Sequence, residues 1–250
     1  MLDYDGTLAP FHTDRFAAFP YPGVEDRLAV LSGLPQVHLV LVSGRPAHEL
    51  RGLLPPTTKA EIWGSHGHER LTRDGSYKLF ALDPEQQATL KRVAGQISAL
   101  GFSETLEVKP SSLAIHWRSF EPAVQEQIHS LVQSLFAGLA EPGNLHLLPF
   151  DGGLEVRSTD RTKGTAVEQI LALEPAALPA AYLGDDLTDE DAFAAVGNRG
   201  FSVLVGAEIR ASLARFWLQP PEGLLEFLDE WIAAVRSQSP ATIATAGASR

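Results

Sequence analysis

Two kinds of hydrophobic pattern alternate along most of the chain. The runs at 37–42 and 180–183 are short and nearly all apolar, and each ends in polar turn residues. This pattern is typical of strands that are buried on both faces of a parallel sheet. Other stretches carry apolar residues at helical spacing, which predicts helices over 24–34, 46–54, 163–173 and 222–235. The alternation predicts an α/β fold with a doubly wound, Rossmann-like parallel-sheet core.

The middle of the chain has a different pattern. It contains a helical run, two strand-like runs, a second helical run and two more strand-like runs. Each helix has one apolar stripe, formed by Leu90, Val93, Ile97 and Leu100 and by Val124, Ile128, Leu131, Leu135 and Leu139. The strand-like runs alternate polar and apolar residues, as in an antiparallel sheet with one wet face. We expect an inserted α+β cap domain at 83–157, a core domain at 1–82 and 158–236, and a disordered tail at 237–250.

Composition and charge narrow the class of protein. The 250 residues include no Cys, and 31 acidic against 20 basic side chains give a net charge of −11. The acidic balance argues against a nucleic-acid partner, and no apolar run is long enough to span a bilayer. The lack of Cys favours a reducing compartment. We therefore expect a monomeric, cytoplasmic protein without nucleic-acid or membrane partners.

Two acidic motifs stand at predicted strand ends. Asp3 and Asp5 open the string Asp-Tyr-Asp-Gly-Thr-Leu. One carboxylate of such a pair can attack phosphorus while the other transfers the proton, although Asp-Gly alone would also suit an ordinary turn. Directly after the predicted strand at 180–183, residues 185–191 hold five carboxylates. These oxygens suit Mg²⁺, and an acidic helix start is the alternative reading.

Two weaker motifs also stand at a predicted strand end or helix start. Ser43-Gly44-Arg45 ends the predicted strand at 37–42, where a hydroxyl and backbone N–H groups can hold a phosphate; a helix-capping Ser is the alternative. Lys163 begins a predicted helix, although a lone lysine is more often a surface residue. The value of both lies in their order along the chain, between the two acidic motifs.

This ordered set of motifs resembles the haloacid dehalogenase-like phosphatases. The resemblance implies that Asp3 is the nucleophile, Asp5 the general acid/base and Lys163 the group that screens charge. It implies a phosphate site formed by Gly6, Thr7, Ser43, Gly44 and Lys163. It also implies Mg²⁺ held by Asp3, the main-chain carbonyl of Asp5 and Asp185, with Asp186 and Asp189 in the outer shell.

In the expected cap, polar residues share one face of three strands. By the period of two, they are the pairs Glu107 with Lys109, His116 with Arg118, and Glu155 with Arg157. The apolar face can pack on the two helices, which leaves a mixed acidic and basic face suited to a polyhydroxyl ligand. A solvated face with cross-strand ion pairs is the alternative.

Several strings in the chain resemble the trehalose-6-phosphate phosphatase family more closely. They are Gly-Ser-His-Gly-His-Glu at 64–69, Lys-Pro-Ser-Ser-Leu-Ala-Ile-His-Trp-Arg at 109–118, and Glu-Val-Arg at 155–157, with Lys163-Gly164 shortly after. The resemblance implies that Lys109, Arg118 and Glu155 bind the disaccharide, with Glu107 on the same face. It places His66 and Glu69 near sugar hydroxyls, and a structural role for their loop is the alternative.

We therefore predict Mg²⁺-dependent hydrolysis of trehalose 6-phosphate through an aspartyl-phosphate intermediate. A same-superfamily phosphatase for another sugar phosphate, such as sucrose or glucose phosphate, is one alternative. A non-catalytic sugar-phosphate-binding protein on this fold is the other. The start of the chain is unusual, because only Met1 and Leu2 precede Asp3 whereas a strand usually has about five or six residues. Either the start is truncated or misassigned, or neighbouring strands close over the gap, and we expect the chain to gain stability from apolar residues added upstream.

Overall fold

The computed structural model describes residues 1–12, 14–118, 120–137, 145–150 and 152–238. The chain forms two compact units, Met1–Lys78 with Thr162–Arg250, and Leu79–Arg161. Most of the expected tail, and Leu139 of the second apolar stripe, lie outside the described residues. Within them, every helix is too short or too polar to cross a membrane.

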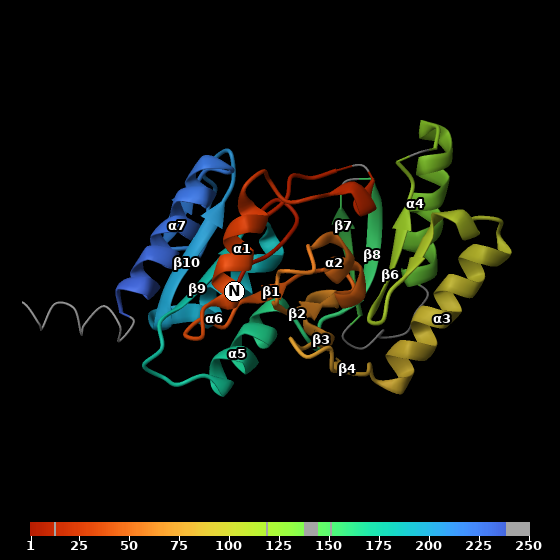
Figure 1. The fold of residues 1–250 in the computed structure, drawn as a ribbon. Coiled ribbons are helices and arrows are strands. Elements are labelled where there is room, and N and C mark those ends of the chain that lie inside the picture. Colours follow the sequence, from red (N-terminus) through yellow and green to blue (C-terminus); the bar gives the residue numbers. More distant parts are fainter. Residues whose placement is uncertain (13, 119, 138–144, 151, 239–250) are drawn as a thin grey trace, which may run out of the picture. The chain divides into compact units, whose positions relative to one another are not determined.

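The first unit contains a mostly parallel sheet in two runs, which the start of the chain joins (Figure 1). Leu2 forms parallel bridges to Leu41 on one side and to Leu183 on the other. One run has the order β1-β2-β3-β4 and the other the order β11-β10-β9. The strands are β1 (Val40–Val42), β2 (Glu61–Gly64), β3 (Glu69–Leu71), β4 (Tyr77–Leu79), β9 (Ala180–Gly184), β10 (Gly200–Val205) and β11 (Phe216–Leu218). The expected α/β fold with a parallel-sheet core is confirmed.

The first strand run is shorter than its hydrophobic pattern predicts. The apolar run extends over 37–42, but β1 begins only at Val40. Leu2 donates its N–H to Val40 O at 2.9 Å and accepts a hydrogen bond from Val42 N at 2.9 Å. At the beginning of the apolar run, Val37 donates its N–H to Leu34 O at 3.0 Å, so this residue belongs to the turn after the preceding helix.

Helices cover both faces of this sheet. Alternate residues of a strand point to opposite faces, so Leu183 and Tyr182 mark the two sides of β9. Leu183 packs in the core with α1 (Val24–Gly33), α2 (Ala47–Leu53) and α7 (Glu222–Ser237). The Tyr182 ring meets Phe193 of α6 (Glu190–Val196), which lies beside α5 (Lys163–Leu173). This two-sided covering confirms the doubly wound arrangement, in which α1 and α7 lie side by side (Figure 1).

The second unit is an antiparallel sheet covered by two helices. The strand order is β5-β6-β8-β7, with β5 (Leu106–Val108), β6 (Ser112–His116), β7 (Leu145–Phe150) and β8 (Gly153–Ser158). Apolar residues of β6 and β8, such as Ile115 and Val156, pack against α3 (Pro84–Ala99) and α4 (Pro122–Ala137). The predicted element order and the packing of the apolar face are therefore confirmed.

The strand expected to reach Arg118 ends earlier. β6 stops at His116. Trp117 still donates its N–H to Gly152 O at 2.9 Å in the register of the ladder, and the bond from Phe120 N–H to Trp117 O at 3.0 Å then closes a turn. Arg118 therefore lies in a turn, and its assignment to the strand face by the period of two was wrong.

Candidate active site

The predicted catalytic motifs of the first unit gather at the carboxyl ends of its parallel strands. Asp3 follows the short segment between β1 and β9, Ser43 follows β1, and Asp185 follows β9. In open α/β sheets, ligands bind at this edge. Lys163 is the first residue of α5, where Thr162 forms a capping box with Thr165 and so fixes the helix start.

Lys163 lies between two buried carboxylates. Its Nζ is 2.9 Å from Asp3 and 2.8 Å from Asp189, and its side chain is 4% exposed. Burial alone would lower the pKa of Lys163, but Asp189 and Asp3 together raise it. Burial raises the pKa of Asp3, and Lys163 opposes that shift. The ammonium group is therefore fixed as a positive charge beside Asp3.

Three carboxylates can converge on one cation. One oxygen each from Asp3, Asp185 and Asp189 lie within 4.8 Å of one another. Burial, followed by the charge of Asp189, raises the pKa of Asp185 to about 7. Oxygen donors at this spacing fit a hard divalent cation, which would reduce the repulsion among the carboxylates. The acidic group can therefore bind a metal ion.

The turn after Asp5 is built closely against Asp185. Gly6 has φ +76°, and a Cβ at this position would lie 2.0 Å from Asp185 Oδ2. Thr7 donates its hydroxyl to Asp185 Oδ1 at 3.4 Å. Glycine is needed here both for the left-handed backbone and for space. The Asp-Gly-Thr string thus holds the two acidic motifs together.

Asp186 and Asp189 differ in position although both were expected in the outer shell. Asp186 is exposed, and its carboxylate accepts the N–H of Leu187 at 2.6 Å, where it caps a 3₁₀ turn. Asp189 is fully buried and accepts hydrogen bonds from Lys163 and from Tyr182 Oη, the latter at 2.5 Å. It also accepts the N–H groups of Asp185 and Asp186 at 3.2 and 3.1 Å. Asp189 therefore organises this loop.

The carboxylate of Asp5 is held by a residue that sequence reasoning left without a role. Arg45 donates from Nε to Asp5 Oδ2 and from Nη2 to Asp5 Oδ1, at 2.7 Å each. The same guanidinium binds Glu49 at 2.9 Å and the carbonyl of Arg15 at 2.6 Å. The spacing of Arg45 and Glu49 by four residues was the available sequence signal. It did not indicate the bond to Asp5.

The loop that contains His66 and His68 supports the Ser43 turn. Ser65 donates its N–H to Arg45 O at 2.8 Å, and His66 donates to Ser43 O at 3.0 Å. A Cβ on Gly44 would lie 2.6 Å from His66 Nε2, so the imidazole packs directly on that glycine. His66 is therefore adjacent to the predicted phosphate-binding turn. His68, two residues later in the chain, is buried.

Glu69 is engaged within the fold. Its carboxylate accepts hydrogen bonds from Ser65 Oγ at 2.5 Å, Ala47 N at 3.2 Å and Tyr77 Oη at 2.9 Å. Burial and this contact raise the pKa of Tyr77 to about 12. The three contacts agree with the structural alternative for this residue, because they fix the loop to the start of α2.

A second unforeseen arginine braces the Asp185 loop. Arg210 donates to the carbonyls of Asp185 at 3.1 Å and Asp186 at 2.8 Å, and it also binds the Glu190 carboxylate. Glu190 in turn accepts the N–H of Leu213 at 2.6 Å. Arg210 lies in an irregular segment with no recognisable pattern, so the sequence offered no signal for it.

In the second unit, the polar sheet face is internally paired. Lys109 Nζ lies 3.0 Å from Glu155 Oε1, which also accepts the Ser112 hydroxyl at 2.7 Å. Glu107 pairs with His116 at 2.9 Å across β5 and β6. Glu155 is buried, whereas the carboxylates of a solvated sheet face would be exposed. The face thus contains the cross-strand ion pairs of the alternative reading and also a buried carboxylate set between two donors.

Taken with the doubly wound sheet, the ordered groups at its carboxyl edge define a haloacid dehalogenase-like hydrolase. Two solved structures share the fold. A trehalose-6-phosphate phosphatase C-terminal domain from C. albicans aligns with TM-score 0.74 and 24% identity, over 93% of this chain and 90% of that one. A phosphatase of the HAD enzyme superfamily from Bacteroides thetaiotaomicron aligns with TM-score 0.59 and 18% identity, over 94% of each.

Sequence comparisons identify the family. The trehalose-phosphatase family model matches residues 1–215, so the chain belongs to the trehalose-phosphatase family. It is 31% identical over 233 residues to a bifunctional trehalose-6-phosphate synthase/phosphatase of Thermoproteus tenax, covering 92% of this chain and 31% of that protein. It is 30% identical over 251 residues to a trehalose-phosphate phosphatase of Mycobacterium tuberculosis, covering 94% and 61%. The chain thus spans less than two thirds of the length of either relative.

Proposed function

We propose that this protein hydrolyses trehalose 6-phosphate to trehalose and phosphate. Family membership supports the substrate, and the carboxyl edge of the sheet supports the reaction. The observation that carries the proposal is the position of Asp3, a buried carboxylate in contact with Lys163 and within 4.8 Å of Asp185 and Asp189. A nucleophile so placed meets a phosphate group beside the ammonium group of Lys163, and a cation bound by the carboxylates would add the positive charge that the phosphate needs.

The reaction we infer has two displacements. An oxygen of Asp3 attacks phosphorus, and the bond between phosphorus and the sugar oxygen breaks as Asp5 protonates that oxygen. Water then attacks the phosphorus of the aspartyl-phosphate while Asp5 takes its proton, which releases phosphate and restores Asp3. Ser43 and Lys163 position the phosphoryl oxygens throughout. Bound Mg²⁺, held by Asp3, Asp185 and the carbonyl of Asp5, would supply neutralisation of charge on those oxygens.

We propose that the second unit, the cap domain of our domain assignment, selects the sugar. Lys109, Arg118 and Glu155 would bind trehalose hydroxyls, with Glu107 as a further acceptor. Support comes from Glu155, whose buried carboxylate is presented by Lys109 and Ser112. Carboxylates accept and ammonium groups donate, so both kinds of sugar hydroxyl contact are available. His66 remains a candidate sugar contact in the first unit.

A panel of sugar phosphates assayed with Mg²⁺ tests this function. Trehalose 6-phosphate should release phosphate with a kcat/KM at least about tenfold above that of glucose 6-phosphate or sucrose 6-phosphate. Comparable release from those esters would contradict trehalose 6-phosphate as the specific substrate, but it would still identify the protein as a sugar-phosphate phosphatase. Saturable binding of the esters without phosphate release would instead identify a sugar-phosphate-binding protein. Chelation of Mg²⁺ should abolish turnover, and added Mg²⁺ should restore it.

We further propose that the protein acts in the cytoplasm as a monomer. The Cys-free composition supports a reducing compartment. Sedimentation equilibrium at micromolar concentration should give a mass near the chain mass of 27.0 kDa. A stable dimer would contradict the proposal.

A further inference from the structure

Phe150 is an exposed aromatic residue on the polar sheet face of the second unit. It is the last residue of β7 and lies opposite Gly153 of β8, and residues directly opposite each other belong to the same face of a sheet. His116 of β6 also lies opposite Gly153. Glu155 follows Gly153 by two residues and so shares this face. The Phe150 ring is therefore on the face that carries the proposed sugar contacts.

Gly153 provides the space for this ring. A Cβ at Gly153 would lie 2.1 Å from Cζ and 2.4 Å from Cε2 of Phe150. The ring therefore lies over the backbone of β8, where a side chain would otherwise stand. It also meets the imidazole of His116, with ring centroids 5.2 Å apart and an interplanar angle of 61°. Such an edge-to-face contact is favourable for aromatic rings, so it helps to fix the orientation of Phe150.

The ring is separate from the apolar core of the second unit. That core lies on the other face of the sheet, where residues such as Ile115 and Val156 pack against α3 and α4. Phe150 is outside this cluster, and 38% of its surface is exposed. The ring therefore offers apolar contact area to a molecule that binds the polar face.

Both hydrogen-bond donors and acceptors lie close to the ring. His116, which touches the ring, binds the Glu107 carboxylate at 2.9 Å. Arg118 packs over Gly152 in the turn that follows Phe150, since a Cβ at Gly152 would lie 2.7 Å from both Cβ and Nε of Arg118. An aromatic ring is thus combined with an acidic group and a basic group at one end of the polar face.

This combination suits a pyranose ring. The C–H groups of a pyranose form an apolar surface, and their hydrogens carry partial positive charge because each carbon is bonded to oxygen. The face of a phenyl ring is negative, so the two surfaces attract each other as they exclude water. The sugar hydroxyls, which point outward from the ring edge, can donate to carboxylates and accept from a guanidinium.

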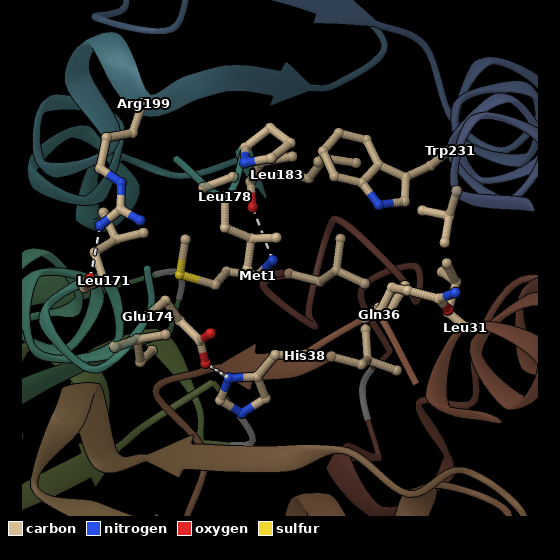
Figure 2. A pocket seen from close by; sticks show the side chains of 18 of the residues that line it. Met1, Leu31, Gln36, His38, Leu171, Glu174, Leu178, Leu183, Arg199 and Trp231 are labelled. Atoms are coloured by element: carbon tan, nitrogen blue, oxygen red, sulfur yellow. Dashed lines mark hydrogen bonds and ion pairs between the residues drawn. The ribbon is translucent and has the colours of Figure 1, made fainter. Parts of the chain in front are cut away.

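The cavity of about 350 Å³ in the first unit does not offer the same combination. Trp231 lines it, but its lining is mostly apolar (Figure 2). His38 Nδ1 is already bound to Glu174 at 2.6 Å, and the terminal nitrogens of Arg199 bind main-chain carbonyls. A pyranose in this cavity would bury hydroxyls against apolar side chains, which is costly. The second unit is therefore the better place for a sugar.

We propose that Phe150 is a specificity-determining residue whose ring stacks on the apolar face of one pyranose ring of the substrate. Glu107 and Arg118 bind hydroxyls at the edge of the same sugar. The inference rests on the proposed function, because it adds a contact to the sugar of the proposed substrate. The ring contributes to sugar binding and has no part in phosphoryl transfer.

Three variants of Phe150 test the stacking contact, with trehalose 6-phosphate and the ring-free ester acetyl phosphate as substrates. Phe150→Ala should raise KM for trehalose 6-phosphate about tenfold and leave kcat within about twofold. Phe150→Tyr keeps the aromatic face and should keep KM within about twofold, whereas Phe150→Leu should raise it about fivefold. Hydrolysis of acetyl phosphate should be unchanged in all three.

Phe216→Ala is the matched control. Phe216 is also an exposed phenylalanine on an edge strand, β11, and its ring also contacts another ring, that of Phe201 at 5.5 Å. Its loss should leave KM for trehalose 6-phosphate unchanged. Equal KM values for Phe150→Ala and Phe216→Ala would overturn the proposal, as would a KM for Phe150→Tyr as high as that for Phe150→Ala. An equal loss on acetyl phosphate would show a structural role.

A binding measurement separates this proposal from the proposed function. Isothermal titration of trehalose 6-phosphate into Asp3→Asn chains, with and without Phe150→Ala, measures sugar binding without turnover. The dissociation constant should be about tenfold higher in the chain that lacks the ring. If the original chain releases no phosphate, the proposed reaction fails and this titration still decides the role of Phe150. Equal dissociation constants, or no binding to either chain, would overturn the stacking contact.

Discussion

Arg45 binds both carboxylate oxygens of Asp5, each at 2.7 Å. The contact joins the Ser43 turn to the residue proposed as the general acid/base. Arg45 also donates its backbone N–H to Ser43 Oγ at 3.2 Å. One residue therefore orients two groups that our proposal places at the same phosphate ester, and its guanidinium is itself fixed by Glu49.

Replacing Arg45 should lower kcat through misplacement of Asp5. We expect Arg45→Ala to reduce kcat for trehalose 6-phosphate by about a hundredfold, because small errors in position are costly for proton transfer. Arg45→Lys keeps the charge but cannot bridge both oxygens, so a smaller loss of about tenfold is expected. Arg51→Ala is the control, since the Arg51 guanidinium binds the carbonyls of Thr58 and Pro55. Equal kcat in all three variants would contradict the positioning role.

Asp3→Asn should remove turnover while leaving the fold intact. The amide cannot attack phosphorus, so kcat should fall by about 10⁴-fold or more. Lys163 retains Asp189 as a partner at 2.8 Å, which keeps its charge compensated in the variant. Asp26→Asn, an exposed change in α1, is the control and should have normal activity. Phosphate release near the normal rate in Asp3→Asn would refute the mechanism.

Arg210→Gln should weaken metal binding without touching a proposed ligand side chain. The variant loses the bonds to the carbonyls of Asp185 and Asp186, so the Asp185 loop loses its brace. Supporting groups of this kind typically contribute about tenfold to a hundredfold in metal affinity. Isothermal titration with Mg²⁺ measures the dissociation constant directly. The exposed Arg215→Gln provides the control, and equal affinities in the two variants would show that Arg210 has no such role.

Lys109→Ala should separate sugar selection from phosphoryl transfer. If the ammonium group binds a sugar hydroxyl, its loss should raise KM for trehalose 6-phosphate by about tenfold or more. Hydrolysis of p-nitrophenyl phosphate, which has no sugar, should be unchanged. Lys91→Ala on the exposed side of α3 controls for the loss of a positive charge. An equal effect on both substrates would argue for a structural role in place of a sugar contact.

His38 should make the stability of the fold depend on pH. Hydrogen bonding to Glu61 raises the pKa of His38, burial opposes this shift, and Glu174 adds to it. A raised pKa means that the charged imidazole stabilises the folded chain fully below about pH 6.5, and that this contribution is lost as pH rises through the folded-state value. Urea unfolding at pH 5.5 and 9 should show a larger cost of His38→Gln at the lower pH. The Met1 amino group titrates in both chains and cancels in the difference.

The order of the candidate site groups was predictable from sequence because it depends on local pattern. Apolar runs end where Ser43 and Asp185 begin the turns, and helical spacing places Lys163 at the first residue of its helix. The bonds of Arg45 and Arg210 were not predictable. The bond of Arg45 to Asp5 joins residues 40 positions apart and the bond of Arg210 to Asp185 joins residues 25 positions apart, and nothing in an arginine's sequence neighbours specifies such a partner.

The positions of the individual carboxylates in the acidic run at 185–191 were also not predictable from sequence. Asp186 and Asp189 are chemically identical, and the short 3₁₀ turn from Leu187 to Asp189 decides which carboxylate points inward. A turn of three residues leaves no periodic signature in the sequence. Arg118 illustrates a different error. The alternation of polar and apolar residues continues in the sequence to Arg118, but the strand ends at His116.

The enclosure of Lys163 bears on how inhibitors could be made. Acylating reagents need a neutral amine that they can reach, and this side chain is 4% exposed with a raised pKa. Such reagents should label exposed lysines such as Lys59 and Lys91 and leave Lys163 unmodified. Covalent inhibitors directed at Lys163 are therefore poorly suited to this protein, and phosphate mimics that engage Asp3, the proposed nucleophile, offer the better chemical starting point.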